Sequence, residues 1–389
     1  MDRRTLLKSS VALFGALSLS GPLGLARAQA TGERPLAAPD AAHPLALNFN
    51  ENALGMSPQA QQAIVTALPG AFRYPDAARE ALIAALAETL ALTPAHISLG
   101  NGSSECIQAV LQSQALAAQR QGKAVQLVVP VVPDPTFNYA ELYLRPLGVE
   151  VVKVGLDAQL AFPLAEMQRR TRDFKGLSLV YLCNPNNPTA TITPADQLAA
   201  WITQAPPDTF FVIDEAYAEF VSDPAFRSAI ELVQAGHENL LVTRTFSKLY
   251  ALAGLRIGYG VAQPAVAAQS EALMSLDNTN TAGAVAALAS LQDRAFVAQS
   301  RKNTDLARQI VCAALDELQL PYLPSQANFI FHQVKGDAAD YQARMKQHHI
   351  LVGRPFPPLN NWNRLTLGTP QEMQQFVTQL HAFRRQGWV

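Results

Sequence analysis

The chain has 389 residues, of which 49% are apolar and 16% charged. This composition excludes a disordered or fibrous protein, and the length allows about two domains of roughly 150 residues each. The net charge of −1 offers no broad positive surface for nucleic acid or acidic lipid. Cys106, Cys183 and Cys312 lack metal-ligand spacing, so we expect neither a disulfide scaffold nor a metal site.

The segment Met1–Ala30 has the composition of an export signal. Arg3 and Arg4 precede Leu-Leu-Lys, a largely apolar stretch follows, and small residues allow cleavage after Ala28 or Ala30. The paired arginines resemble the twin-arginine type, which carries folded proteins across the bacterial inner membrane. Gly, Ser and Pro22 interrupt the apolar stretch, which argues against a permanent membrane anchor. We therefore expect a periplasmic protein that uses the export machinery for folded proteins; the alternative is an ordinary amphipathic helix.

The rest of the chain alternates short apolar runs with helical patterns. Helices are expected over Ala60–Ala67, Ala77–Leu92, Ser104–Ala118, Pro194–Gln204 and Ala225–Gln234. Strands are expected over Val125–Val132, Val149–Val154, Leu177–Leu182, Phe210–Ile213, Leu240–Thr243 and Arg256–Val261. Continuous apolar strands that alternate with helices predict an α/β fold, with a mainly parallel sheet covered on both faces.

The character of the chain changes after Gln292. A long helix over Ala295–Leu318 leads to the strand Phe329–His332, a helix around Tyr341–His348, the strand Arg364–Leu367 and a last helix from Pro370. This order predicts a small α+β domain over residues 293–389, beside a large domain over 76–292. Residues 31–75 are expected to form an N-terminal arm and part of the small domain.

Ligands of open α/β sheets bind beyond the carboxyl ends of the strands, so the residues that follow each strand are informative. Gly100 and Gly102 lie just before a predicted helix, where free backbone N–H groups and the helix dipole favour an anion. Ser103 adds a hydroxyl donor. The simpler interpretation is a turn capped by Ser103 or Ser104.

Three further strand ends carry polar groups. Two prolines hold amide side chains in Cys183–Thr189, although asparagines are also common in plain turns. Asp214 follows an apolar strand and would be desolvated unless a cation or an N–H meets it, whereas a surface position fits Glu215 better. Lys248 follows another strand, after hydroxyl residues and before Arg256. Desolvation and a nearby cation lower the pKa of a lysine and favour formation of a Schiff base.

In combination, these motifs resemble the fold-type I pyridoxal phosphate (PLP) aminotransferases, and most closely the histidinol-phosphate aminotransferase group. The resemblance runs from Leu47–Asn52 to Arg364–Thr369 and covers nearly all of the chain after the signal. It implies a large PLP-binding domain with a smaller α+β domain, PLP as cofactor, amino acid and 2-oxo acid substrates, and a homodimer.

The resemblance also implies roles for single residues around the PLP ring. Lys248 would link covalently to PLP and move the substrate proton, and Asp214 would pair with the pyridine nitrogen. Tyr217 and Asn187 would hydrogen-bond the phenolic oxygen of the ring. Phe137 would stack on the ring, and the alternative is that it is an ordinary core aromatic.

Other residues would hold the anionic groups. The PLP phosphate would be bound by Gly102, Ser103, Ser247 and Arg256, together with Tyr74 from a partner subunit. Arg364 would clamp the acidic group of the substrate, Asn52 would line the same pocket, and Arg354 would act as a second anion clamp.

Departures from the family pattern concern the substrate. Ala53 and Leu54 stand where the family usually has Pro-Tyr, Ser104 replaces an aspartate, Ala190 replaces a glycine, and Gly353 is an extra residue. None of them alters Lys248, so we expect intact chemistry with a free α-amino acid preferred over histidinol phosphate, because Leu54 would favour an aliphatic or aromatic side chain.

Two other classes of function remain open from the sequence. A PLP-dependent lyase, decarboxylase or racemase would share the same cofactor-binding residues, and Arg364 argues for transamination because it can hold the carboxylates of donor and acceptor in turn. A non-catalytic ligand-binding relative is the other alternative, and the presence of Lys248 speaks against it.

Overall fold

The computed structural model describes residues 36–131, 139–157 and 159–389, and Ala37–Val389 forms one compact unit. The predicted export signal and the predicted stacking residue Phe137 lie outside the described residues. Within them, no helix has both the length and the apolar character needed to cross a membrane.

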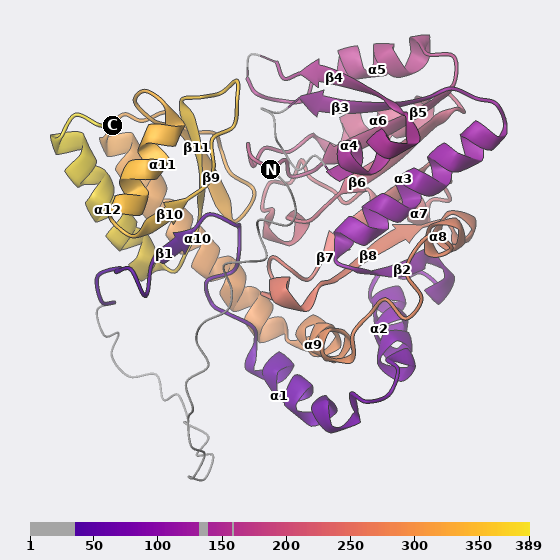
Figure 1. Cartoon of the computed structure of the whole chain (residues 1–389), viewed down its shortest axis with the longest axis horizontal. Helices are drawn as coiled ribbons and strands as arrows, with labels where there is room; N and C mark the ends of the chain where they lie inside the picture. The colour runs from indigo at the N-terminus through magenta and orange to yellow at the C-terminus, as the bar shows by residue number, and fades with distance from the viewer. Residues whose placement is uncertain (1–35, 132–138, 158) are drawn as a thin grey trace. The chain divides into compact units, whose positions relative to one another are not determined.

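A seven-stranded sheet forms the centre of the larger part of the molecule (Figure 1). Its strands are β2 (Ile97–Asn101), β3 (Val125–Val131), β4 (Glu150–Gly155), β5 (Leu177–Cys183), β6 (Thr209–Asp214), β7 (Leu240–Thr245) and β8 (Ile257–Ala262). They lie in the order β2-β8-β7-β6-β5-β3-β4. Strand β8 is antiparallel to both of its neighbours, and the pairs from β7 to β4 are parallel. The predicted α/β fold with a mainly parallel sheet is confirmed.

The sheet is buried on both faces, which explains its continuous apolar strands. Along β5 and β6, Val180 and Phe211 belong to one hydrophobic cluster, whereas Leu179 and Val212 belong to another. Successive side chains of a strand point to opposite faces, so both faces carry a core. The helices of this part are α2 (Asp76–Thr89), α3 (Ser103–Arg120), α4 (Tyr139–Leu144), α5 (Leu164–Asp173), α6 (Ala195–Gln204), α7 (Ile230–Gln234), α8 (Pro264–Glu271) and α9 (Thr281–Gln292).

The helix expected over Ala225–Gln234 is a wrong prediction in its first half, because α7 begins only at Ile230. The carboxylate of Asp223 accepts from the N–H of Ala225 at 2.8 Å. The carboxylate of Glu215 accepts from the N–H of Ala229 at 2.6 Å. A helix that began at Ala225 would need the N–H of Ala229 for its own backbone hydrogen bonds, and Glu215 takes that donor, so the segment stays irregular.

The C-terminal part has its own core and two small sheets. It contains α10 (Arg294–Glu317), β9 (Phe329–Gln333), α11 (Ala338–Gln347), β10 (Ile350–Val352), β11 (Trp362–Thr366) and α12 (Pro370–Arg385). Strand β1 (Leu45–Leu47) pairs in parallel with β10, and β9 pairs antiparallel with β11. Near the start of the chain, α1 (Pro58–Ala67) packs on α9. Strands β1 and β10, of three residues each, were not expected from the sequence.

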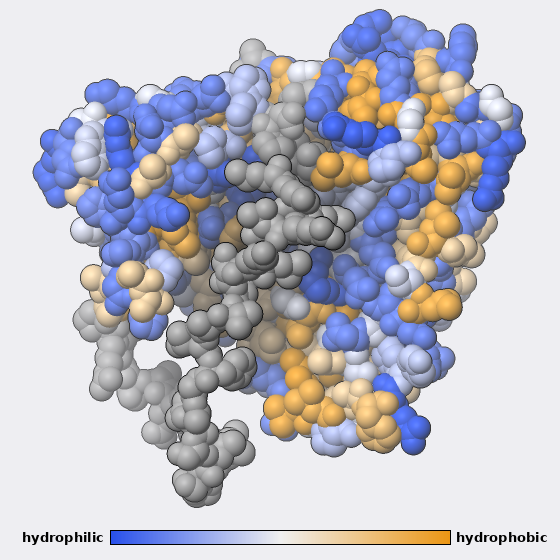
Figure 2. All heavy atoms as spheres, in the orientation of Figure 1, coloured by the Kyte–Doolittle hydropathy of each residue, from blue (hydrophilic) through white to orange (hydrophobic). Residues whose placement is uncertain are grey.

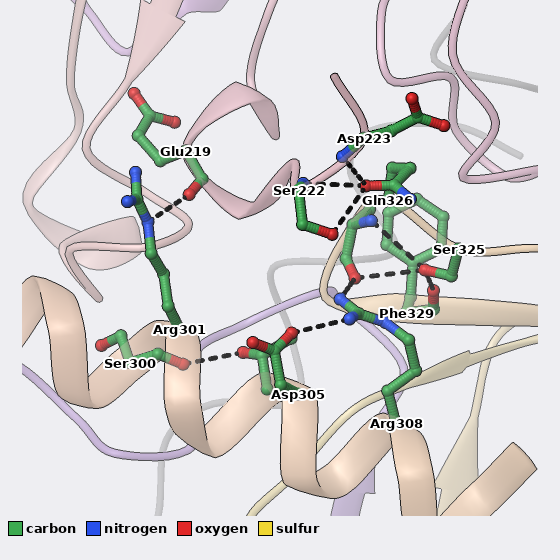
Figure 3. A network of polar contacts seen from close by, with 12 residues as sticks. Glu219, Ser222, Asp223, Ser300, Arg301, Asp305, Arg308, Ser325, Gln326 and Phe329 are labelled. Atoms are coloured by element: carbon green, nitrogen blue, oxygen red, sulfur yellow. Dashed lines mark hydrogen bonds and ion pairs between the residues drawn. The ribbon is translucent and has the colours of Figure 1, made fainter. Parts of the chain in front are cut away.

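Polar contacts join α10 to the loop that follows β6 (Figure 3). Arg301 donates from Nε to the carbonyl of Glu219 at 2.6 Å. The Oε1 atom of Gln326 accepts from the N–H groups of Ser222 at 2.9 Å and Asp223 at 3.2 Å. The loop after Asp214 is therefore held by side chains from the C-terminal part of the chain.

Candidate active site

A cavity of about 450 Å³ lies at the carboxyl ends of β5, β6 and β7 and at the start of α3. Eight of the predicted site residues line it: Ser103, Asn187, Asp214, Tyr217, Ser247, Lys248, Arg256 and Arg364. Its other lining residues are Phe49, Asn50, Ser104, Tyr139, Cys183, Ala216, Thr245 and Ala253. Residues separated by up to 315 positions in the sequence thus meet where an α/β sheet binds its ligand.

Asp214 ends β6 and is buried. The phenol of Tyr181 donates to its Oδ2 at 2.9 Å, and the hydroxyl of Thr243 donates to its Oδ1 at 3.0 Å. Burial raises the pKa of Asp214, and the two hydroxyl donors act in the opposite direction. The carboxylate faces the cavity as a buried acceptor for a cationic N–H group.

Lys248 follows β7, and its Nζ donates to the backbone carbonyl of Phe49 at 3.0 Å. Burial and the positive charge of Arg364 lower the pKa of Lys248 to about 8. A larger fraction of its amine is therefore neutral near pH 7 than in a solvated lysine, and the neutral amine is the form that attacks an aldehyde.

One end of the cavity is built for an anion. Gly102 has a φ of 76° at the start of α3, and a Cβ there would overlap the guanidinium of Arg256. Arg256 itself has a left-handed φ of 57°, and its carbonyl accepts from the N–H of Gly102 at 3.0 Å. Its Nη1 and Nη2 lie 3.4 Å from Ser247 Oγ and 3.5 Å from Ser104 Oγ. A guanidinium, hydroxyls and the N-terminus of an 18-residue helix are suited to a phosphate.

A further cation, Arg364, also lines the cavity. Its Nη1 donates to Asn187 Oδ1 at 2.8 Å and its Nη2 to the carbonyl of Asn48 at 2.6 Å. Its Nε is buried and has no acceptor among the described residues. Burial and the charge of Arg354 lower the pKa of Arg364 to about 10, so it remains cationic at neutral pH. This guanidinium can take a carboxylate from the cavity.

Four predicted site residues are described but do not line the cavity. Gly102 contacts Arg256, and its lack of a Cβ leaves room for the guanidinium. Asn52 donates from Nδ2 to the carbonyl of Leu249 at 2.6 Å and to Ser300 Oγ at 3.0 Å, so its amide braces the chain beside Lys248. The guanidinium carbon of Arg354 lies over the ring of Phe356, 4.4 Å from the ring centroid.

Tyr74, the fourth of these, is 76% exposed and does not reach the cavity of its own chain. Leu54 also lies outside the lining residues, whereas Phe49 is among them. Within one chain, Leu54 therefore does not line the cavity, contrary to the role expected for it.

Glu215 corrects another expectation. Its carboxylate is fully buried instead of lying on a surface loop, and it accepts from Arg244 Nε at 2.9 Å and from Ser228 Oγ at 2.7 Å. A cation on the neighbouring strand was the signal available in the sequence, because Arg244 directly follows the residue that pairs with Asp214.

Asn50 also lies at the site, although it was not predicted from the sequence, and its Nδ2 donates to the hydroxyl of Tyr217 at 3.0 Å. Asn48, Asn50 and Asn52 alternate along one short segment, and each has a contact at or beside the site. We call residues 48–52 the asparagine segment. The regular spacing of its asparagines at every second position was the feature of the sequence that could have identified Asn50 as a site residue.

The donor set fits PLP. The anion-binding end suits its phosphate, buried Asp214 suits a protonated pyridine nitrogen, and Lys248 provides an amine for its aldehyde. The space that a Cβ at Gly102 would fill and the unpaired Nε of Arg364 are independent signs of a site built for anionic ligands.

Comparisons with known proteins agree with this geometry. The model of the family "Aminotransferase class I and II" matches residues 42–380. A histidinol-phosphate aminotransferase from Moorella thermoacetica is 34% identical over 339 residues, which cover 86% of this chain and 84% of that protein.

Solved structures give the same result. A protein from Erwinia carotovora atroseptica with a provisional histidinol-phosphate aminotransferase name is 43% identical, with a TM-score of 0.87 over 91% of this chain and 100% of that one. The histidinol-phosphate aminotransferase from Sinorhizobium meliloti, solved in complex with PLP, is 26% identical, with a TM-score of 0.78 over 88% and 91% of the two chains. The chain therefore belongs to the class I and II aminotransferases and is a PLP-dependent aminotransferase.

Proposed function

We propose that this aminotransferase moves an amino group between a free α-amino acid with an aliphatic or aromatic side chain and a 2-oxo acid such as 2-oxoglutarate or pyruvate. The observation that carries the proposal is the guanidinium of Arg364, which lines the cavity and whose buried Nε has no acceptor among the described residues. A buried cationic donor is costly unless an anion meets it, and a substrate carboxylate provides two acceptor oxygens.

The remaining lining residues support an apolar substrate. Phe49, Ala216 and Ala253 offer apolar surface beside the polar atoms of the cavity. Among the described residues, three cationic side chains line it, of which Arg256 belongs to the anion-binding end and Lys248 provides the reactive amine. Arg364 then remains for the α-carboxylate that amino acids and 2-oxo acids share and that histidinol phosphate lacks.

The residues divide the work of transamination. When bound, PLP supplies an electron sink for the charge that develops at the substrate α-carbon. Asp214 keeps the pyridine nitrogen protonated, and Lys248 accepts and returns the proton at the α-carbon. Arg364 orients the substrate by its carboxylate, and Tyr217, held by Asn50, donates its hydroxyl toward the ring side of the cavity.

The test is a comparison of half-reactions. The visible absorbance of the purified holoenzyme is followed after addition of single amino acids or histidinol phosphate, and the apparent second-order constants are compared. We expect an aliphatic or aromatic amino acid to react fastest, and Arg364→Gln to raise the KM for amino acids at least tenfold. The proposal is wrong if histidinol phosphate reacts faster than every amino acid, or if CO₂ rather than a 2-oxo acid is the product.

We further propose that the active enzyme is a homodimer. Figure 2 shows apolar side chains at the surface over the region of α1, and Val65, Phe72, Tyr74 and Leu276 are more than 60% exposed. Apolar patches of this kind mark association surfaces. A second copy would cover them and bring its Tyr74 to the anion-binding end of the cavity.

Mixed dimers test this arrangement. A subunit with Tyr74→Phe is combined with a subunit with Lys248→Ala, so that one site of the pair contains both native residues if Tyr74 acts across the interface. We expect this mixed dimer to regain one site with native PLP affinity. A fully active monomer in light scattering would contradict the proposal.

The export proposal rests on Met1–Ala30 alone, which lies outside the described residues. Paired arginines before an apolar stretch support a route for folded proteins, and such a route suits an enzyme that takes up PLP in the cytoplasm. Cell fractionation of the double variant Arg3→Lys, Arg4→Lys is the test. We expect the variant to remain in the cytoplasm, and unchanged export would refute the twin-arginine assignment.

A further inference from the structure

We propose that Tyr181 and Thr243 are positioning residues that hold the Asp214 carboxylate ionised and oriented toward the pyridine nitrogen of PLP. Neither residue lines the cavity, so each would act through Asp214. The proposal concerns the shared chemistry of the enzyme and is independent of the substrate, dimer and export proposals.

The three side chains come from three adjacent parallel strands. Thr243 on β7 lies directly opposite Asp214 on β6, and Cys183 on β5 lies opposite Asp214 on the other side. Tyr181 is two residues before Cys183, so its side chain points to the same face of the sheet. The strand register therefore places one hydroxyl group on each side of the carboxylate.

Each oxygen of the Asp214 carboxylate accepts a hydrogen bond from one of these hydroxyl groups. Tyr181 donates to Oδ2 at 2.9 Å and Thr243 donates to Oδ1 at 3.0 Å. All three residues are buried, so water does not compete for these contacts. A carboxylate can accept about four hydrogen bonds, which leaves lone pairs on the cavity side for an N–H group.

The hydroxyl groups also oppose the effect of burial. A buried carboxyl group tends to hold its proton, and a protonated Asp214 could not stabilise a protonated pyridine nitrogen. Two hydroxyl donors favour the ionised form, and their fixed strands restrict rotation of the carboxylate. Without them, Asp214 would face the ring in a less acidic state and in more than one orientation.

The test compares Tyr181→Phe and Thr243→Val with two controls. Thr243→Ser keeps the hydroxyl group. Tyr341→Phe removes another buried phenol, one without a hydrogen-bond partner among the described residues. For each variant, the affinity of the cofactor-free protein for PLP is measured by equilibrium dialysis. The visible absorbance of the holoenzyme is then followed as the pH is changed.

We expect Tyr181→Phe and Thr243→Val each to weaken PLP binding about tenfold, to shift the absorbance titration, and to lower kcat more than they raise KM. Thr243→Ser and Tyr341→Phe should retain native PLP affinity and the native titration.

A PLP analogue with a C–H group in place of the ring nitrogen separates positioning from packing. Since this analogue cannot pair with Asp214, Tyr181→Phe should bind it as well as the native protein does. An equal loss of affinity for PLP and for the analogue would overturn the proposal, as would native affinity for PLP in both hydroxyl-free variants. If Tyr181→Phe does not fold, the comparison of Thr243→Val with Thr243→Ser alone decides between these outcomes.

Discussion

Lys248 Nζ donates to the backbone carbonyl of Phe49 at 3.0 Å, and this contact joins the reactive amine to the asparagine segment. The same segment supplies the carbonyl of Asn48 to Arg364 and the amide of Asn50 to Tyr217. Three functional side chains are thus held by one short segment near the start of the chain, two through its backbone carbonyls and one through a side-chain amide. The segment fixes their positions before any ligand arrives, which reduces the entropy cost of binding.

The pKa of Lys248 predicts how the enzyme without PLP captures its cofactor. Only the neutral amine reacts with the aldehyde, so the rate of covalent capture should rise with pH and level off above about pH 8. The measurement is the stopped-flow absorbance change on mixing PLP with the cofactor-free protein over a range of pH. The positive charge of Arg364 contributes to the low pKa of Lys248. Arg364→Gln should therefore move the inflection to higher pH, and a native inflection near the usual lysine value of 10.5 would contradict the prediction.

Gly102→Ala should weaken PLP retention at least tenfold. A Cβ at this position overlaps the guanidinium of Arg256, which must then move away from the anion-binding end. The control is Gly122→Ala, because Gly122 has a similar φ of 72° but nothing within 4 Å of an added Cβ. Both variants carry the backbone strain of a left-handed residue, and Gly102→Ala alone carries the clash. Equal PLP affinities in equilibrium dialysis would show that Gly102 serves the turn and not the phosphate.

The sequence predicted the sheet well because its strands are buried on both faces and read as continuous apolar runs. The resemblance to the aminotransferase family predicted eight residues of the cavity. Six of them end or follow a strand or begin a helix, whereas Arg256 precedes β8 and Arg364 lies within β11. Leu45–Leu47 and Ile350–Val352 were not predicted, because strands of three residues are too short to show a period.

Errors arose where long-range polar contacts decide the local structure. Glu215 is buried because Arg244, on the neighbouring strand, neutralises it, and Glu215 in turn prevents a helix before Ile230 by taking the N–H of Ala229. Asn52 lies close to the site, but its amide contacts protein groups instead of the cavity. Such pairings depend on three-dimensional proximity, and local pattern does not encode them.

Asn52→Ala should lower stability with little effect on substrate binding. The substitution removes the donors to Leu249 O and Ser300 Oγ and leaves a carbonyl beside Lys248 without its partner. The loss of unfolding free energy should be about 1–3 kcal/mol in urea denaturation. Ser300→Ala removes one acceptor only and should cost less. A raised KM with native stability would instead place Asn52 in contact with the substrate.

His332 should make the protein sensitive to acid. Its ring is fully buried on β9 and packs edge-on against Tyr341, with ring centroids 6.0 Å apart. The Nδ1–H group donates to the carbonyl of Gln333 at 2.9 Å, which leaves the buried Nε2 as an acceptor with no partner among the described residues. Burial lowers the pKa of His332 from 6.5 to about 4, since an imidazolium there would be desolvated and unpaired.

The sign of the effect follows from proton uptake. Between about pH 6.5 and pH 4 the unfolded chain protonates His332 and the folded chain does not, so acid favours unfolding. The unfolding free energy should fall by up to about 3 kcal/mol across this interval, with no further loss from this residue below it. His332→Phe keeps an aromatic ring and removes the titration, so its urea midpoint should depend less on pH over the same interval. Parallel pH profiles for the native protein and His332→Phe would show that the buried imidazole does not control stability in acid.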